Sequence, residues 1–269
     1  MDFRDPVTLG RTGLMVGRLG VASGYGAPPE AIEMAFERGC NYFTWGTFIR
    51  GRSPNMATAI RRIVANGQRD KLVLSMFSYA HQAFLTEKML VRGLRAVGLD
   101  HAEVLVLGYF SRRPRRSIVE GALRLKEKGL VRFVGLSGHR RPLFPELRRE
   151  GLLDVFHIRY NAVNCGAERD AFPGLVGEGR PGVVAFTATA WGKLCNPAKM
   201  PQGEPAPSAA DCYRFALSHP AVDVCMMGAR TLEEVRQNLT ALDRGPLDDE
   251  EMRRMRKIGD HLYGKPRVA

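Results

Sequence analysis

Long apolar runs and patterned cysteines are both missing from this 269-residue sequence. No stretch approaches the roughly 18 consecutive apolar residues of a membrane-spanning helix, and the N-terminus lacks the apolar core of a signal peptide. We therefore expect a cytoplasmic protein that does not enter a membrane. The five cysteines contain no C-x-x-C pair, so neither a disulfide framework nor a metal site is predicted. They are Cys40, Cys165, Cys195, Cys212 and Cys225.

Acidic residues are scarce as well. The chain has 28 acidic and 40 basic residues, a formal net charge of +12, and 32 of the basic residues are arginine. The arginine excess reflects either the nucleotide composition of the gene or an anionic partner, such as a small ligand or an acidic protein. No zinc finger, nucleic-acid-binding motif or alternation of aromatic and basic residues accompanies it, which argues against a nucleic-acid partner. Nothing in the sequence indicates an oligomeric state.

A G-x-G-x-x-G motif does not follow the first predicted strand, which argues against a Rossmann domain. Instead, eight apolar strand segments alternate with helical patterns along the whole chain. The strands begin near residues 19, 42, 72, 103, 132, 155, 182 and 222. They are continuously apolar, as expected when both faces of a parallel sheet are covered. This predicts an α/β fold, a (β/α)8 TIM barrel that forms one domain over residues 1–269.

Two further segments fit this prediction. Residues 7–9 and 14–16 are short apolar runs around a four-residue turn, which predicts an N-terminal β-hairpin. The proline-rich segment 196–208 is interpreted as a loop between the last two strands and not as a domain boundary.

Several segments in the same order resemble the aldo-keto reductase superfamily over nearly the whole length. They are Leu9 to Leu14, Arg18 to Gly20, Ala35 to Phe43, Leu125 to Ser137, Tyr160-Asn161, Gly182 to Thr187 and Gly228 to Asn238. The resemblance implies a barrel that binds NADP(H) and places its reactive groups in the loops after the strands.

The resemblance also implies a catalytic tetrad of Asp, Tyr, Lys and His, and all four are replaced. The Asp position falls on Thr44, the Tyr position on Phe48 or Ile49, the Lys position on Phe77 or Met76, and the His position on Gly108. None of these side chains replaces the Tyr proton donor or the Lys that lowers its pKa. The sequence therefore predicts a pseudoenzyme with respect to ordinary carbonyl reduction.

The cofactor positions implied by the resemblance are better preserved. Ser137 matches the residue that holds the nicotinamide carboxamide, His157 stands in place of a Gln, and Phe186 replaces the Tyr that stacks on the nicotinamide. Arg230 precedes a predicted capping box, Thr231-x-x-Glu234, so that free backbone N–H groups and the guanidinium form a phosphate site. The full predicted cofactor set is Ser137, His157, Phe186, Thr187, Gly228, Arg230, Thr231, Glu234 and Asn238.

Other residues near strand ends are candidates for substitute acids and bases. They are Tyr109, His139, His157, Tyr160 and Lys193, of which Tyr109, His157 and Tyr160 are the catalytic candidates. The alternative is that each is a hydrogen-bonded wall residue. We expect Trp45 to fill the volume beside Gly108 and to border the substrate.

Eight arginines follow strands two, four and five, so we expect them to surround the mouth of the barrel. They are Arg50, Arg52, Arg112, Arg113, Arg115, Arg116, Arg140 and Arg141. Such a ring would attract an acidic ligand, with Arg112 and Arg140 as the predicted substrate contacts. The alternative is a set of solvated loops, because arginine pairs also occur elsewhere in the chain.

Two functional hypotheses follow. The first is an aldo-keto reductase-like protein that binds NADP(H) without the standard chemistry. The second is an oxidoreductase that reduces an acidic carbonyl compound with a relocated proton donor, Tyr109, His157 or Tyr160.

Overall fold

The computed structural model describes residues 2–46 and 54–264. Phe48, Ile49, Arg50 and Arg52 lie outside the described residues, so the predictions that fall on them have no structural counterpart.

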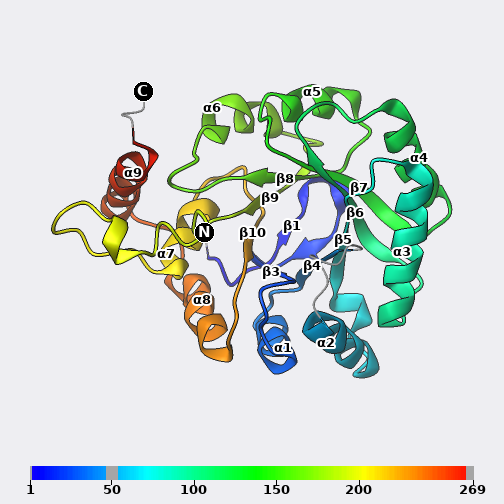
Figure 1. Ribbon diagram of the computed structural model, residues 1–269, viewed down its shortest axis with the longest axis horizontal. Helices are drawn as coiled ribbons and strands as arrows, with labels where there is room; N and C mark the ends of the chain where they lie inside the picture. The colour runs from blue at the N-terminus through cyan, green and yellow to red at the C-terminus, as the bar shows by residue number, and fades with distance from the viewer. Residues whose placement is uncertain (1, 47–53, 265–269) are drawn as a thin grey trace.

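Eight parallel strands close into a barrel in the order β10-β3-β4-β5-β6-β7-β8-β9. Helices surround the barrel on the outside (Figure 1). The strands are β3 (Leu19–Ala22), β4 (Tyr42–Gly46), β5 (Val73–Ser78), β6 (Ala102–Phe110), β7 (Val131–Gly138), β8 (Val155–Arg159), β9 (Gly182–Phe186) and β10 (Val224–Met227). The predicted (β/α)8 fold is confirmed, and every barrel strand lies where the apolar runs placed it.

Helices lie between the barrel strands and after the last one. They are α1 (Pro29–Glu37), α2 (Pro54–Ala65), α3 (Ala83–Val97), α4 (Arg116–Glu127), α5 (Leu143–Glu150), α6 (Ala167–Asp170), α7 (Ala209–Leu217), α8 (Leu232–Arg244) and α9 (Asp249–Tyr263). Short 3₁₀ segments lie at Gly10–Thr12, Arg69–Lys71, Phe172–Leu175 and Pro197–Lys199. Within the described residues, no helix is long and apolar enough to cross a membrane.

The first helix illustrates why these segments are helical. Pro29 occupies the first turn of α1, where its missing N–H costs nothing. Ile32, Ala35 and Phe36 repeat at helical spacing and are buried. Gly39 then adopts a φ of +87°, a conformation that suits glycine and turns the chain into β4.

The predicted hairpin is present and covers one end of the barrel. Strands β1 (Val7–Thr8) and β2 (Met15–Val16) pair antiparallel, and Leu9, Leu14 and Val16 pack against the inward residues of the barrel. Gly10 lies directly against β9, because a Cβ at this position would be 2.2 Å from the backbone nitrogen of Gly182. This end of the barrel is therefore filled by side chains.

Alternation along each strand divides the core into two layers. Tyr42 and Val73 face the barrel interior, whereas Phe43 and Leu74 pack in the larger cluster that includes the helices. Because side chains alternate with a period of two, Thr44 and Phe77 share the inward side with Tyr42 and Val73. The register therefore decides which residues at the strand ends meet inside the barrel.

Candidate functional site

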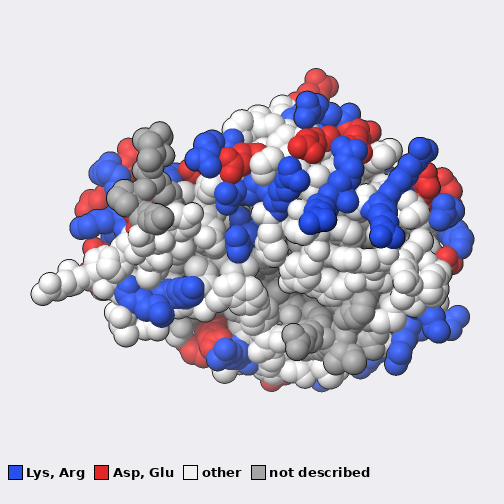
Figure 2. All heavy atoms as spheres, turned by 45° about the horizontal axis from the view of Figure 1, so that its top comes forward, with Lys and Arg blue, Asp and Glu red and all other residues white. Residues whose placement is uncertain are grey.

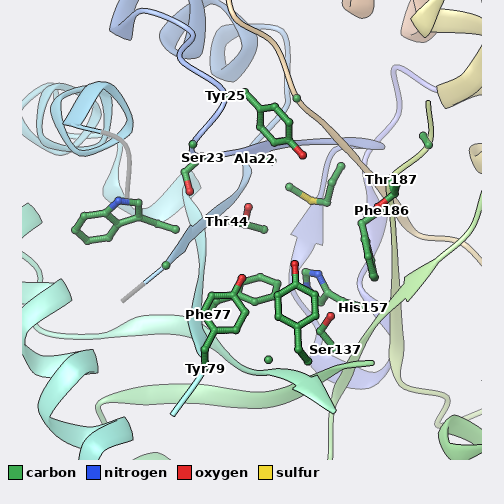
Figure 3. A pocket seen from close by; sticks show the side chains of 18 of the residues that line it. Ala22, Ser23, Tyr25, Thr44, Phe77, Tyr79, Ser137, His157, Phe186 and Thr187 are labelled. Carbon is green, nitrogen blue, oxygen red and sulfur yellow. The ribbon is translucent and has the colours of Figure 1, made fainter. Parts of the chain in front are cut away.

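A pocket of about 920 Å³ lies at the carboxyl ends of the strands. Residues from all eight barrel strands or the loops directly after them line it, together with Tyr213 of α7. Figure 3 shows Tyr25 on one side of the cavity and Phe77, Tyr79, Ser137 and His157 on the other. In a barrel of this kind, the carboxyl ends of the strands are where chemistry takes place.

The pocket has no charged lining residue among the described residues. Its titratable groups are instead four of the seven tyrosines and three of the six histidines. These are Tyr25, Tyr79, Tyr109, Tyr213, His81, His139 and His157. Phe77, Phe186, Trp45 and Trp191 add further aromatic surface. The lining favours planar, uncharged groups over ions.

His157 forms the floor of the pocket and is almost completely buried, with 1% of its surface exposed. Its Nε2 atom is 2.8 Å from the hydroxyl of Tyr42, and its ring meets Phe77 edge to face at a centroid distance of 5.0 Å. Burial lowers the pKa of His157 from 6.5 to about 3. The imidazole is therefore neutral at physiological pH and lacks the second ring proton with which an imidazolium acts as a general acid.

The space beside Gly108 is occupied by Tyr79. A Cβ at position 108 would lie 2.5 Å from the Tyr79 ring, so glycine is required for the ring to fit. Our expectation that Trp45 fills this volume is wrong. Trp45 borders the pocket, but its side chain is 2% exposed and packs in the outer core cluster, because it has the opposite parity to Thr44 on β4.

Four aromatic rings form a continuous wall at the rim. Tyr79 stacks on Tyr109 at 5.0 Å, Tyr109 on His139 at 5.7 Å, and His139 approaches Phe186 at 6.0 Å. Tyr109 is 51% exposed and has a φ of +52°. A left-handed conformation at a tyrosine is strained, and such strain is common at functional sites.

The loop after β9 is strained in the same way. Thr187, Ala190 and Trp191 have φ values of +62°, +50° and +60°. All of the loop from Thr187 to Thr189 borders the pocket, as does Trp191, which is 74% exposed. The backbone of this loop therefore holds a large exposed ring at the pocket entrance.

The structure brings three of the four tetrad positions together. Thr44, Phe77 and Gly108 all border the pocket. Phe48, the remaining position, lies outside the described residues. The three described positions thus share one site, as the resemblance implies, but offer only one hydroxyl and no titratable group.

The predicted cofactor residues fall into two groups. Ser137, His157, Phe186, Thr187 and Gly228 border the pocket. The remaining four, Arg230, Thr231, Glu234 and Asn238, lie at or within α8 and do not line it.

The start of α8 differs in one detail from the predicted capping box. Thr231 accepts a hydrogen bond from the Glu234 backbone N–H at 3.1 Å, as expected. However, the Glu234 carboxylate accepts the N–H of Arg230 at 2.7 Å, one residue before the helix cap. A negative charge therefore already lies beside the predicted phosphate site, while the Arg230 side chain is exposed.

Two of the substitute acids are not in the pocket. Tyr160 packs between Phe172 and Phe215, and its hydroxyl donates to Glu168 at 2.6 Å. It is one residue beyond Arg159, so strand alternation directs it away from the barrel axis. Lys193 is exposed and does not border the pocket. Tyr109, His139 and His157 remain as pocket residues.

The six arginines of the predicted ring that the structure describes do not line the pocket either. Arg112 and Arg140 are exposed and are not among the lining residues, so the structure does not support them as direct contacts for a ligand inside the pocket. Arg113, Arg116 and Arg141 form ion pairs with Glu150, Glu120 and Asp170, respectively. Lys and Arg side chains gather over the upper part of the face in Figure 2, above its central hollow.

Sequence reasoning missed five aromatic lining residues: Tyr25, Tyr79, His81, Trp191 and Tyr213. A signal was available for Tyr79 and His81, because both follow β5 directly and the loop after a barrel strand is a candidate site. No sequence signal placed Tyr25 against Gly228, where a Cβ would lie 2.9 Å from the tyrosine ring.

Comparison with known proteins supports the resemblance. The aldo/keto reductase family model matches residues 187–260. A comparison with curated proteins finds no match.

Solved structures with the same fold include the aldo-keto reductase AKR11C1 from Bacillus halodurans in its apo form. It is 19% identical with a TM-score of 0.77, and the alignment covers 94% of this chain and 95% of the other. The holo form of the same protein has a TM-score of 0.76 at 19% identity and covers 94% of this chain and 96% of the other. An aldo/keto reductase from Klebsiella pneumoniae, in complex with NADP and acetate, has a TM-score of 0.76 at 19% identity. The alignment covers 98% of this chain and 97% of the other.

Proposed function

With an aldo-keto reductase fold and a family match in its C-terminal part as the premise, we propose that the protein binds NADP(H) but does not reduce ordinary carbonyl compounds by the family mechanism. One observation carries this proposal. The pocket retains Ser137 and Phe186 while the tetrad positions beside them are Thr44, Phe77 and Gly108. Binding and proton transfer use different residues, so one can persist without the other.

The residues present fit the nicotinamide end of the cofactor. Phe186 offers a ring for stacking, which needs no hydroxyl, and Ser137 offers a hydroxyl beside His157 on the neighbouring strand. Because neutral His157 is held by Tyr42, it adds no positive charge near a nicotinamide ring. A solved relative is described as a complex with NADP, which supports the same assignment. When bound, NADPH would supply a hydride.

The other end of the cofactor would lie at the start of α8. The helix N-terminus and the exposed Arg230 guanidinium favour a phosphate there. The Glu234 carboxylate opposes it. We assign the 2′-phosphate to Arg230, because a guanidinium binds phosphate oxygens with charge-assisted hydrogen bonds.

Proton transfer is the step that this chain does not support in the standard way. Thr44 is a poor acid, Phe77 and Gly108 have no polar side-chain atom, and Phe48 has no hydroxyl. Loss of a general acid alone costs about 10²–10⁴ in rate. Ordinary aldehydes are therefore expected to remain unreduced.

A second candidate function is reduction of an acidic carbonyl compound with a relocated proton donor. Tyr109 is the candidate that the geometry favours, because it borders the pocket and is open to solvent. His157 is neutral and buried, and Tyr160 lies outside the pocket. If slow turnover occurs, Tyr109→Phe should abolish it while keeping the ring stack.

The experiment combines binding and turnover. Purified protein is titrated with NADPH by calorimetry, and NADPH consumption is then followed with a panel of uncharged aldehydes. We expect saturable binding and no consumption above the protein-free blank. Phe186→Ala should weaken binding, whereas Arg92→Gln, an exposed change on α3, should not. Absence of NADPH binding would contradict the cofactor assignment, and rapid aldehyde reduction would contradict the loss of standard chemistry. A cytoplasmic location stays a prediction.

A further inference from the structure

Arg159 is the last residue of β8, two residues beyond His157 of the pocket floor, and is not itself one of the residues that line the pocket. It has the same parity as His157, so both are on the inward side of the strand. Its Cα is in register with that of Phe186 on β9. Its charge also reaches His139, whose pKa is lowered first by burial and second by Arg159. Arg159 therefore lies beside two members of the aromatic wall.

Arg159 differs from the other buried or partly buried arginines in the polar partners of its side chain. Among the described residues, each other arginine that is at least partly buried has a hydrogen bond to a carboxylate or a backbone carbonyl. These are Arg18, Arg69, Arg141, Arg148, Arg180, Arg214, Arg254 and Arg256. Arg159 is partly buried, and its side chain has neither a hydrogen bond nor an ion pair to any residue that the structure describes. A guanidinium withdrawn from water in this way has five donors available for an anion.

The pocket beside Arg159 suits a flat ring. Tyr79, Tyr109, His139 and Phe186 present their faces or edges along one side. None of the described lining residues is charged. A ligand that is ionised throughout would lose hydration without compensation. A ligand with one charged end avoids this cost when that end stays at the rim.

We propose that Arg159 binds the anionic group of an aromatic carboxylate whose ring lies against Tyr79 and Tyr109. The inference deepens the proposed function, because it takes the same pocket as the binding site and names the class of the second ligand. It assigns Phe186 to the nicotinamide and the remaining wall to the ligand ring. The anionic group is a carboxylate of the ligand and not a phosphate of the cofactor, and the experiment separates these two sources.

The test uses a matched pair of probes, 2-naphthoate and the uncharged 2-naphthamide, titrated by calorimetry with and without saturating NADPH. A guanidinium–carboxylate hydrogen bond contributes roughly ten- to a hundredfold in affinity. The wild-type protein should therefore bind naphthoate that much more tightly than naphthamide. Arg159→Gln should remove the preference and leave naphthamide binding nearly unchanged, and Arg159→Lys should restore part of it. Arg92→Gln should behave like wild type.

Each other outcome has a defined meaning. Equal naphthoate affinity in wild type and Arg159→Gln would overturn the proposal. Weakened NADPH binding in Arg159→Gln, with naphthoate unaffected, would overturn it by assigning the guanidinium to a cofactor phosphate. Loss of both probes in Arg159→Gln would also count against it, provided thermal melting shows a folded variant. Naphthoate binding that depends on Arg159 without any NADPH binding would support the carboxylate site while contradicting the proposed cofactor.

Discussion

The ring of Tyr79 fills the space that a side chain at Gly108 would occupy. A Cβ at position 108 would lie 2.5 Å from the Tyr79 ring, closer than two carbon atoms pack in a protein interior. The space at position 108, which the resemblance matches to a histidine, is therefore filled by a residue that follows the neighbouring strand. Burial, together with the neighbouring Tyr109, raises the pKa of Tyr79, so its hydroxyl stays protonated near neutral pH.

Gly108→Ala should destabilise the protein by about 1–3 kcal/mol, because the new methyl group overpacks the site. Urea unfolding would measure the change. Tyr79→Ala in the same chain removes the clash, so the double variant should lose less stability than the sum of the single variants. Additive losses would show that Tyr79 does not limit the residue at position 108.

Stability should fall as the pH drops, in part because of His157. Its pKa is about 3 in the folded chain and 6.5 ordinarily. Between these two pKa values the unfolded chain binds a proton that the folded chain does not. The contribution of His157 to the free energy of unfolding is therefore complete above pH 6.5 and is lost as the pH falls towards about 3. For one such group, the free energy of unfolding changes by at most about 1.4 kcal/mol per pH unit.

His157→Gln tests this linkage, because glutamine does not titrate but can still hydrogen-bond to Tyr42. Urea unfolding between about pH 4 and 6 should show a shallower pH dependence than in wild type. Identical slopes in the two proteins would mean that His157 is not kept neutral by burial.

Cofactor selectivity should respond in opposite directions to two changes at the start of α8. Arg230→Ala should remove most of a preference for NADPH over NADH of roughly ten- to a hundredfold. Glu234→Gln should increase that preference, because it removes the negative charge while keeping an acceptor for the Arg230 N–H. NADH binding should stay nearly constant in both variants. An equal loss of both dinucleotides in Arg230→Ala would show that the arginine supports the loop and does not bind the phosphate.

Fluorescence emission should distinguish the exposed Trp191 from the buried Trp45. Trp191 is 74% exposed at the pocket entrance, whereas Trp45 is 2% exposed. Trp191→Phe should therefore shift the emission to shorter wavelength and remove most of the quenching by acrylamide. It should also remove most of any quenching caused by NADPH. An unchanged spectrum would contradict the exposure of Trp191.

The order of elements and the barrel followed from local patterns in the sequence. Continuous apolar strands, helical stripes and glycines such as Gly39 act over a few residues, so each could be recognised without knowledge of the rest of the chain. The tetrad positions followed from the family resemblance, and Thr44, Phe77 and Gly108 do meet in one pocket.

Tertiary structure decided which residues line the pocket and which lie outside it. Tyr160 and Arg159 are neighbours in sequence, yet alternation along the strand places Tyr160 in a cluster with Phe172 and Phe215 and Arg159 on the inward side, in register with Phe186. Tyr79 reaches Gly108 only because β5 and β6 are adjacent in the closed barrel. The sequence by itself determined the strands and the helices of the barrel, since these depend on local composition. Only the packed structure determined the aromatic wall, the neutral His157 and the Arg159 side chain, which has no polar partner among the described residues. Each of these depends on distance and burial between segments remote along the chain.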